Sequence, residues 1–104
     1  MPGQFLKSTV MNLAWTIYKK SNKEFKDCLR IAWRNVHLIH KMKSQVVHFF
    51  YVKADKTIRE AFGTLQDQYI PQITYPKRNA NVLIQRYFDV TEQQWRSFRK
   101  ENLL

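Results

Sequence analysis

The chain has 104 residues, of which 44% are hydrophobic and 14% aromatic, a content that suits one globular domain over residues 1–104 and excludes a disordered chain. Eighteen Lys and Arg against eight Asp and Glu give a net charge of +10, which attracts phosphate polymers and other anionic partners. Cys28 is the single cysteine, which excludes an internal disulfide and a cysteine-based zinc site. No run reaches the roughly 20 apolar residues of a membrane helix and no signal peptide is recognisable, so we expect a cytoplasmic protein without a membrane partner.

The first 43 residues are predicted to be helical. Ser8 can cap a helix that runs to about Lys20. Its apolar residues predict a largely buried helix; they are Met11, Leu13, Ala14, Trp15, Ile17 and Tyr18. Ser21, followed three residues later by Glu24, is the pattern of a capping box. A second helix is therefore expected to begin at this box and to run to about Met42.

The second helix separates apolar from basic residues. One stripe, at steps of three and four residues, predicts the core side; it comprises Phe25, Cys28, Leu29, Ala32, Val36 and Ile39. A second stripe at similar steps is basic; it comprises Lys23, Lys26, Arg30, Arg34, His37 and Lys41. At 1.5 Å rise per residue the basic stripe is about 27 Å long. A row of this kind can neutralise phosphates, although a solvated helix face or a site for an acidic protein would show the same pattern.

After the helices the pattern changes to that of strands. Val46–Val52 is rich in β-branched and aromatic residues, and Lys53–Lys56 has the composition of a tight turn. Thr57–Leu65 is the expected return strand, in which Gly63 suggests a bulge or a sharp bend. A long loop over Gln66–Asn81 follows, with a short helical turn expected at Asp67–Ile70.

Short elements are also predicted for the end of the chain. They are a strand over Val82–Val90, a turn over Thr91–Gln94, a strand over Trp95–Phe98, a helical turn over Arg99–Asn102 and a last short strand at Leu103-Leu104. The fold class is therefore α+β: two N-terminal helices in residues 1–43, then four to five short antiparallel strands that form a curled sheet or small barrel in residues 44–104.

Two stretches of the strand half, "TIREAFGTL" and "YFDVTEQQWRSFRKENLL", resemble small proteins of Bacteroides and of the crAss-like tailed phages that infect them. Those proteins are described as SH3-like or Sm-like β-barrels related at the fold level to WYL domains. The resemblance covers about Val46–Leu104, with a weaker match around Leu29–Trp33. It implies a small barrel fold and an association with nucleic-acid ligands. No ligand-site residue is carried over from it.

Further basic clusters are candidates for anion contacts. Tyr75, Lys77 and Arg78 in the long loop combine an aromatic ring with two cations, as single-strand recognition on small barrels requires, although an exposed linker would also carry them. Another basic cluster lies near the C-terminus; it comprises Arg86, Arg96, Arg99 and Lys100. The simpler interpretation is that these residues form ion pairs with neighbouring acids. Trp33, at the border of the two stripes, is expected to pack against a strand, with base stacking as the alternative.

Enzymatic chemistry finds no support in the sequence. Gly3 and Gly63 are the only glycines, so a glycine-rich phosphate loop is absent. His37 and His40 are correctly spaced for one metal ion, but His48 does not complete a ligand set. We therefore expect neither catalysis, nor a metal, nor a cofactor.

The sequence thus favours a non-enzymatic nucleic-acid-binding barrel. DNA or RNA phosphates would dock on Lys23, Lys26, Arg30, Arg34 and Lys41, with the basic loop as a second contact. The main alternative is a protein-interaction or assembly component, such as a phage structural or host-takeover protein, acting through a protein partner or as a homo-oligomer. A weaker alternative is a sensor that holds a small ligand in the barrel mouth.

Overall fold

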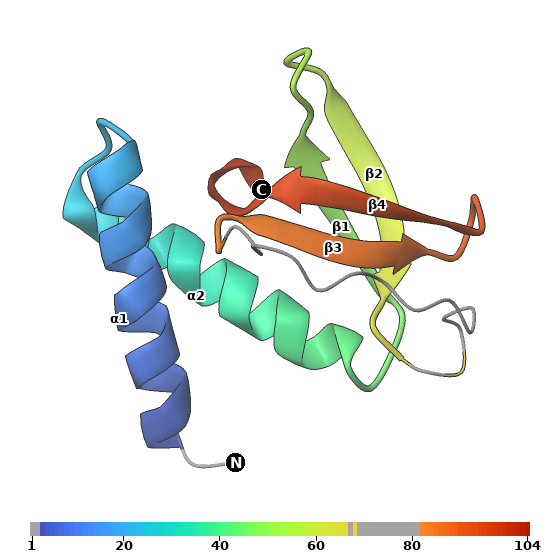
Figure 1. The fold of residues 1–104 in the computed structure, drawn as a ribbon, viewed down its shortest axis with the longest axis horizontal. Helices are drawn as coiled ribbons and strands as arrows, with labels where there is room; N and C mark the ends of the chain where they lie inside the picture. Colours follow the sequence, from blue (N-terminus) through green and yellow to red (C-terminus); the bar gives the residue numbers. More distant parts are fainter. Residues whose placement is uncertain (1–2, 67, 69–81) are drawn as a thin grey trace.

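The computed structural model describes residues 3–66, 68 and 82–104. Helix α1 (Gly3–Lys20) and helix α2 (Phe25–Met42) precede the strands (Figure 1). The strands are β1 (Val47–Val52), β2 (Ile58–Thr64), β3 (Ile84–Asp89) and β4 (Gln94–Arg99), and a 3-10 turn, η2, covers Lys100–Asn102. Neighbouring strands pair antiparallel in the order β1-β2-β3-β4. The predicted α+β class is confirmed. The predicted loop over Gln66–Asn81, with its helical turn, lies almost entirely outside the described residues.

The sheet curls because β1 is paired on both sides. It pairs with β2 over six positions, from Val47↔Gly63 to Val52↔Ile58. On its other side Tyr51 forms an antiparallel bridge with Leu103, and the Leu104 N–H donates to the Phe50 carbonyl at 3.0 Å. The helical turn predicted before Leu103 and the final short pairing are both confirmed. Together they close the end of the chain onto its first strand.

Gly63 is needed for close packing inside the barrel. A Cβ atom there would lie 2.5 Å from Tyr87 Cδ2 and 3.0 Å from Phe49 Cε1. Both rings belong to the barrel core, and Tyr87 is fully buried. The φ angle of Gly63 is not positive, so the glycine provides space for the rings and not an unusual backbone conformation.

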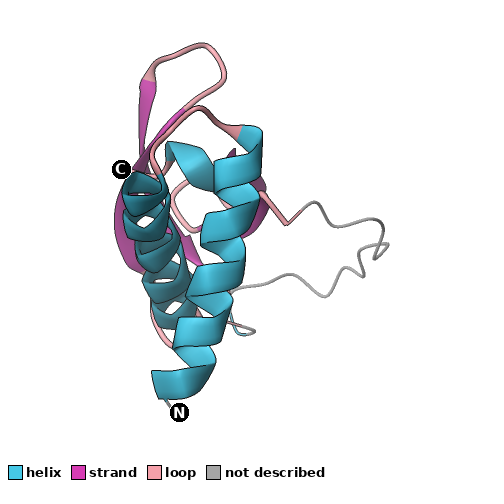
Figure 2. Ribbon diagram, turned by 90° about the vertical axis from the view of Figure 1, so that its left-hand side faces the viewer, coloured by secondary structure: helices cyan, strands magenta, loops and turns pink. Residues whose placement is uncertain are grey.

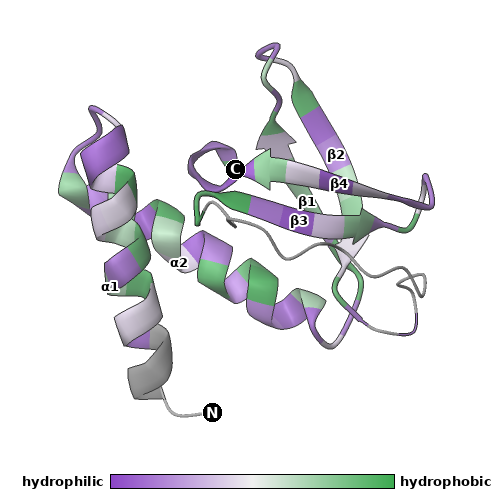
Figure 3. Cartoon of the chain, viewed as in Figure 1, coloured by the Kyte–Doolittle hydropathy of each residue, from purple (hydrophilic) through white to green (hydrophobic). Residues whose placement is uncertain are grey.

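Two apolar clusters form the interior. The first lies between α1 and α2 and comprises Val10, Leu13, Ala14, Ile17, Cys28, Ile31, Ala32, Val36 and Leu83. The second fills the barrel and comprises Leu38, Met42, Phe49, Tyr51, Ala61, Tyr87, Phe98 and Leu103. Helix α2 contributes to both, and Figure 3 shows the hydrophobic segments of α2 next to α1 and beneath the strands. The predicted core stripe of α2 was therefore too narrow, because it lacked the buried residues Ile31 and Asn35 and also Leu38 and Met42, which enter the barrel.

Polar groups join the helices to the barrel. The Asn35 side chain, fully buried, donates from Nδ2 to the Ile31 carbonyl at 2.9 Å and to the Lys100 carbonyl at 2.8 Å. The Thr64 hydroxyl donates to the Met42 carbonyl at 3.1 Å. Buried hydrogen bonds of this kind fix the position of α2 against the end of β2 and against η2.

The connection between the helices differs from the prediction. Helix α1 begins at Gly3, earlier than expected, and the capping box at Ser21 is wrong. The N-cap of α2 is Glu24, which makes no side-chain capping bond. The Ser21 hydroxyl instead accepts the Lys23 N–H at 3.4 Å, since Ser21 lies in the bend directly after α1. The predicted end of α2, at Met42, is confirmed.

Helix α1 packs on α2 and leaves its own outer side uncovered. Figure 2 shows the two helices side by side. Three large residues that were predicted to be buried lie on this uncovered side; they are Met11, Trp15 and Tyr18. In the described part of the chain, neither helix is long and apolar enough to cross a membrane.

Candidate functional site

The basic stripe predicted from the sequence lies on the exposed side of α2. The buried residues of α2 lie on the opposite side of the helix. All members of the stripe that lie in the helix are exposed; they are Lys26, Arg30, Arg34, His37 and Lys41. Lys23 is exposed as well, but it lies in the bend before α2. The structure therefore brings five of the six stripe residues onto one helical face, which we call the α2 basic face.

Acidic residues hardly neutralise the α2 basic face. Lys26 Nζ lies 3.5 Å from Glu24, and Arg30 lies 3.7 Å from Asp27, with all four side chains largely exposed. Exposed pairs of this kind are typically worth less than about 1 kcal/mol, so an incoming phosphate can replace them. Within the described ranges, Arg34 and Lys41 form no ion pair.

Trp33 also lies on this face. Its side chain is 37% exposed, and its ring stacks on His37 with centroids 5.2 Å apart and an interplanar angle of 27°. The expectation that Trp33 packs against a strand is wrong, because the strands cover the opposite side of α2. The indole is therefore accessible among the cations.

Aromatic rings also gather where the two helices meet. Trp15 lies 4.4 Å from Phe25 between ring centroids, and Tyr18 packs edge-on against both at 5.7 Å. Trp15 and Tyr18 are 48% and 44% exposed. This cluster sits at the surface because nothing in the described chain covers the outer side of α1.

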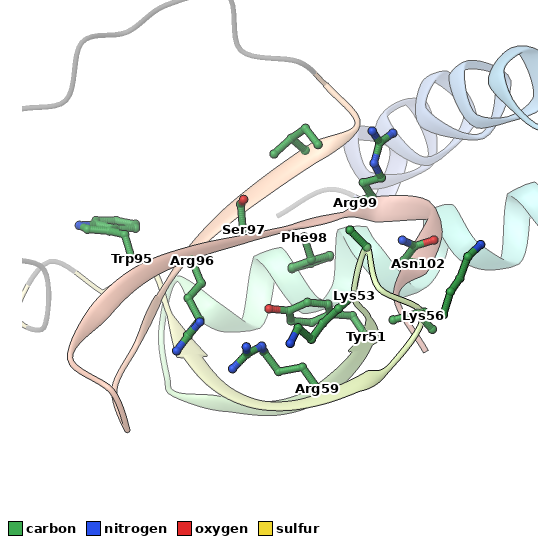
Figure 4. A pocket seen from close by; sticks show the side chains of 13 residues that line it. Tyr51, Lys53, Lys56, Arg59, Trp95, Arg96, Ser97, Phe98, Arg99 and Asn102 are labelled. Carbon is green, nitrogen blue, oxygen red and sulfur yellow. The ribbon is translucent and has the colours of Figure 1, made fainter.

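A second basic site is a groove in the barrel with a volume of about 780 Å³ (Figure 4). Of its cations, the sequence had indicated only Arg96 and Arg99, as part of the C-terminal cluster. Five cations line it and none of its described lining residues is acidic; the cations are Lys53, Lys56, Arg59, Arg96 and Arg99. Figure 4 shows the charged ends of Lys53, Arg59 and Arg96 pointing toward one another from three segments of the barrel. Trp95, Tyr51 and Phe98 add aromatic surface to the same groove.

One cation of this barrel groove is held firmly in place. Arg96 Nε donates to Asp89 Oδ2 at 3.0 Å, and the Asp89 side chain is almost completely buried. The other carboxylate oxygen of Asp89 accepts the backbone N–H groups of Thr91 and Glu92 at 2.9 and 3.1 Å. The turn between β3 and β4 therefore orients Asp89, which in turn orients Arg96. Such an orientation reduces the entropy lost when a ligand binds.

The remaining groove cations are less constrained. Lys53 lies 3.8 Å from Asp55, and Arg99 lies 3.7 Å from Glu101, while Lys56 and Arg59 form no ion pair with any described residue. The ion pairing considered for the C-terminal cluster is thus present for Arg96 and Arg99. The groove as a whole could not be predicted, because its cations lie in the turn between β1 and β2, in β2 and in β4. Only the pairing register of the sheet brings these segments together.

Several other candidates do not join either site. Tyr75, Lys77 and Arg78 lie outside the described residues. Lys100 is half-buried, and burial lowers the pKa of its amine, so it is not part of a solvated basic cluster. His48 pairs with Glu60 at 2.7 Å, and across the described ranges no group of three His, Cys, Asp or Glu side chains could hold a metal ion.

Two tyrosine hydroxyls meet inside the barrel. The Tyr51 and Tyr87 hydroxyls share a hydrogen bond of 2.9 Å. Burial, followed by this hydrogen bond, raises the pKa of Tyr87 far above its ordinary value of 10.0, so its hydroxyl stays protonated at neutral pH. This pair satisfies two polar groups inside the core and thereby stabilises the barrel.

The fold and the sites define a small closed β-barrel that carries a helical extension and two basic surfaces. A family model described as WYL_2, Sm-like SH3 beta-barrel fold, matches residues 35–104, and the chain belongs to this family. No curated protein and no solved structure matches the chain. The match confirms the barrel fold and the predicted relation to WYL domains. It begins at Asn35, so α1 and the first half of α2 precede it.

Proposed function

We propose that this protein is a non-enzymatic nucleic-acid-binding barrel that docks phosphates on the α2 basic face. The observation that carries this proposal is the row of exposed cations along one side of α2, with two weakly held acids beside it. From Lys26 to Lys41 the row is about 22 Å long at 1.5 Å per residue. That length can contact several phosphates of one strand, and each contact releases counterions and adds affinity.

The barrel groove supplies a second anion contact in this proposal. Its three converging cations, Lys53, Arg59 and Arg96, form a concave site for one phosphate group. A polymer with repeated phosphates can occupy both sites, whereas a small anion would use the groove alone. The comparison of the two sites by mutation therefore separates a polymer-binding protein from a sensor of small anions.

The test is a salt titration of binding to single- and double-stranded oligonucleotides. We expect the logarithm of the affinity to fall linearly with the logarithm of salt concentration. The double variant Arg30→Glu/Arg34→Glu should bind at least about tenfold more weakly, with a slope reduced by about two, because each lost phosphate contact removes about one unit. Groove variants at Lys56 and Arg59 should have a smaller effect.

The matched control changes the net charge by the same amount elsewhere. Lys7→Glu/Lys43→Glu alters two exposed lysines outside both sites, and it should retain most of the affinity. An equal loss in the control would show that overall charge, and not the α2 basic face, causes the binding. Absence of binding to any oligonucleotide at low salt would overturn the proposal.

A protein-assembly role is the second candidate, and the outer face of the β1–β2 hairpin favours it. Phe50, Phe62 and Ile58 are exposed there, the last by 64%. His48 stacks flat on Phe62, with ring centroids 4.4 Å apart. Light scattering after size exclusion would show a defined oligomer that persists at high salt and is lost in Phe50→Glu. A monomer under all conditions would contradict self-assembly through this face.

A further inference from the structure

Two parallel lines of residues, each with steps of four, run along α2. The first line begins with Phe25 and Leu29, which are partly buried against the core between the helices, and continues on the exposed side with Trp33, His37 and Lys41. The second line, displaced by one residue, contains Lys26, Arg30 and Arg34. Residues four apart are neighbours on a helix surface, so the exposed rings of Trp33 and His37 lie directly beside the cationic line.

A second group of aromatic rings lies where the two helices meet. Trp15 of α1 packs on Phe25 at 4.4 Å and is itself 48% exposed. Lys19 and Lys20 occupy the last turn of α1, close in the chain to Tyr18, the other exposed ring of this group. Rings on both helices are therefore accessible to a partner and have cations beside them.

We infer that the α1–α2 face binds single-stranded nucleic acid, with phosphates along the cationic line and bases stacked on Trp33 and Trp15. This inference rests on the proposed function and specifies its substrate. The charges of the cationic line complement a phosphate backbone, and exposed indoles offer flat surfaces for unpaired bases. Base stacking on aromatic side chains tolerates any sequence, because every base has a π face.

A duplex fits this face less well. In a duplex the bases are already stacked on one another, so a protein can contact only their edges. The protein element that does so must be narrow enough to enter the major groove. Here the exposed rings extend over two adjacent helices, which together are wider than the single helix that such a groove admits. The aromatic rings would then face the phosphate backbone and gain nothing from stacking.

The family match leaves out most of this face. It begins at Asn35, whereas Trp15, Phe25, Arg30 and Trp33 all precede that residue. The binding mode inferred here therefore belongs to the helical extension of this chain. The barrel would retain its own anion contact in the groove.

The experiment compares single- and double-stranded oligonucleotides of equal length, with tryptophan fluorescence as a second measurement. We expect at least about tenfold tighter binding of the single strand and quenching of fluorescence on binding. Trp33→Ala and Trp15→Ala should each weaken single-strand affinity about 5- to 150-fold, the range for loss of one stacked base. Their salt slopes should stay unchanged, since no charge is lost, and Trp33→Phe should recover part of the affinity.

Phe62→Ala is the matched control, because it removes an equally exposed ring from the barrel, and it should leave the affinity unchanged. Circular dichroism verifies that each variant is folded. If duplex and single strand bind equally and both tryptophan variants bind like the parent, this inference is wrong, while a retained effect of Arg30→Glu/Arg34→Glu still supports the proposed function. Binding to vesicles of anionic phospholipid in preference to single strands would overturn both.

Discussion

The helical extension and the barrel carry equal numbers of cations but differ in how many acids accompany them. Residues 1–52 contain nine Lys and Arg against two acids, whereas residues 53–104 contain nine against six. In the barrel, acids hold several cations, as Asp89 holds Arg96. On α2 the acids are few and solvent-exposed, so the charge remains available to a partner. In the function proposed above, the barrel, which the family shares, would serve mainly as a scaffold, and the extension would provide the main docking surface.

The two regions are nevertheless connected through α2. Its first half packs against α1 in one apolar cluster, and Leu38 and Met42 belong to the barrel cluster. The Asn35 side chain adds a buried hydrogen bond from α2 to the Lys100 carbonyl, 2.8 Å long. We therefore expect the two regions to unfold together, which the first prediction tests.

The largest loss of stability is expected for Ile17→Ala. Ile17 is fully buried between the helices, and truncation of such a side chain typically costs about 2–4 kcal/mol of unfolding free energy. If the regions are cooperative, the helical far-ultraviolet signal and the near-ultraviolet signal of the barrel tyrosines shift to the same lower midpoint. A shift confined to the helical signal would show that the regions unfold separately. Ser8→Ala, exposed on α1, should change stability by less than about 0.5 kcal/mol.

A smaller loss of stability is expected for Gly63→Ala, which alters packing inside the barrel only. The added methyl group would lie 2.5 Å from Tyr87 Cδ2, and the buried ring has little space to move. Overpacking of this kind costs about 1–3 kcal/mol, which denaturant titration would measure. The near-ultraviolet spectrum should change even in the native state, because the tyrosine environment is altered. Parental stability and an unaltered spectrum would mean that the rings adjust freely.

The smallest expected effect is a change in the pKa of Asp55 in the β1–β2 turn. Its Oδ1 accepts the Thr57 hydroxyl at 2.6 Å and the Thr57 N–H at 3.0 Å. The Thr57 side-chain bond, followed by the backbone bond, lowers the pKa of Asp55 below 3.8. A lowered folded-state pKa means that this stabilisation is present above the unfolded pKa and is lost as the pH falls through the folded value.

Thr57→Val removes the stronger of these bonds and keeps the other. In an NMR titration the pKa of Asp55 should rise toward 3.8, and the acid unfolding midpoint should change little because the group is exposed. Thr16→Val, in α1, is the control. A pKa that does not move in Thr57→Val would contradict the assignment of the hydroxyl as its main cause.

Local patterns in the sequence were sufficient to predict the elements and one of the two sites. Helical spacing identified the α2 basic face, and β-branched runs identified the strands to within about two residues. Exposure was harder to predict, because apolar residues around α1 indicate burial only if a second layer covers them, and the described chain leaves Trp15 about half exposed. The barrel groove depends on register: Arg59 and Arg96 are far apart in the chain, and no local pattern connects them.

The bridge between Tyr51 and Leu103 has a consequence for the order of folding. It joins residues 52 positions apart, whereas the contacts between α1 and α2 join segments that follow one another directly. Closing a long loop costs more entropy and takes more time than forming a local helical pair. We expect the helical hairpin to form first, with Leu38 and Met42 of α2 then presenting an apolar surface on which the strands collapse. The element that carries the proposed docking surface would thus also be the nucleus around which the barrel is built.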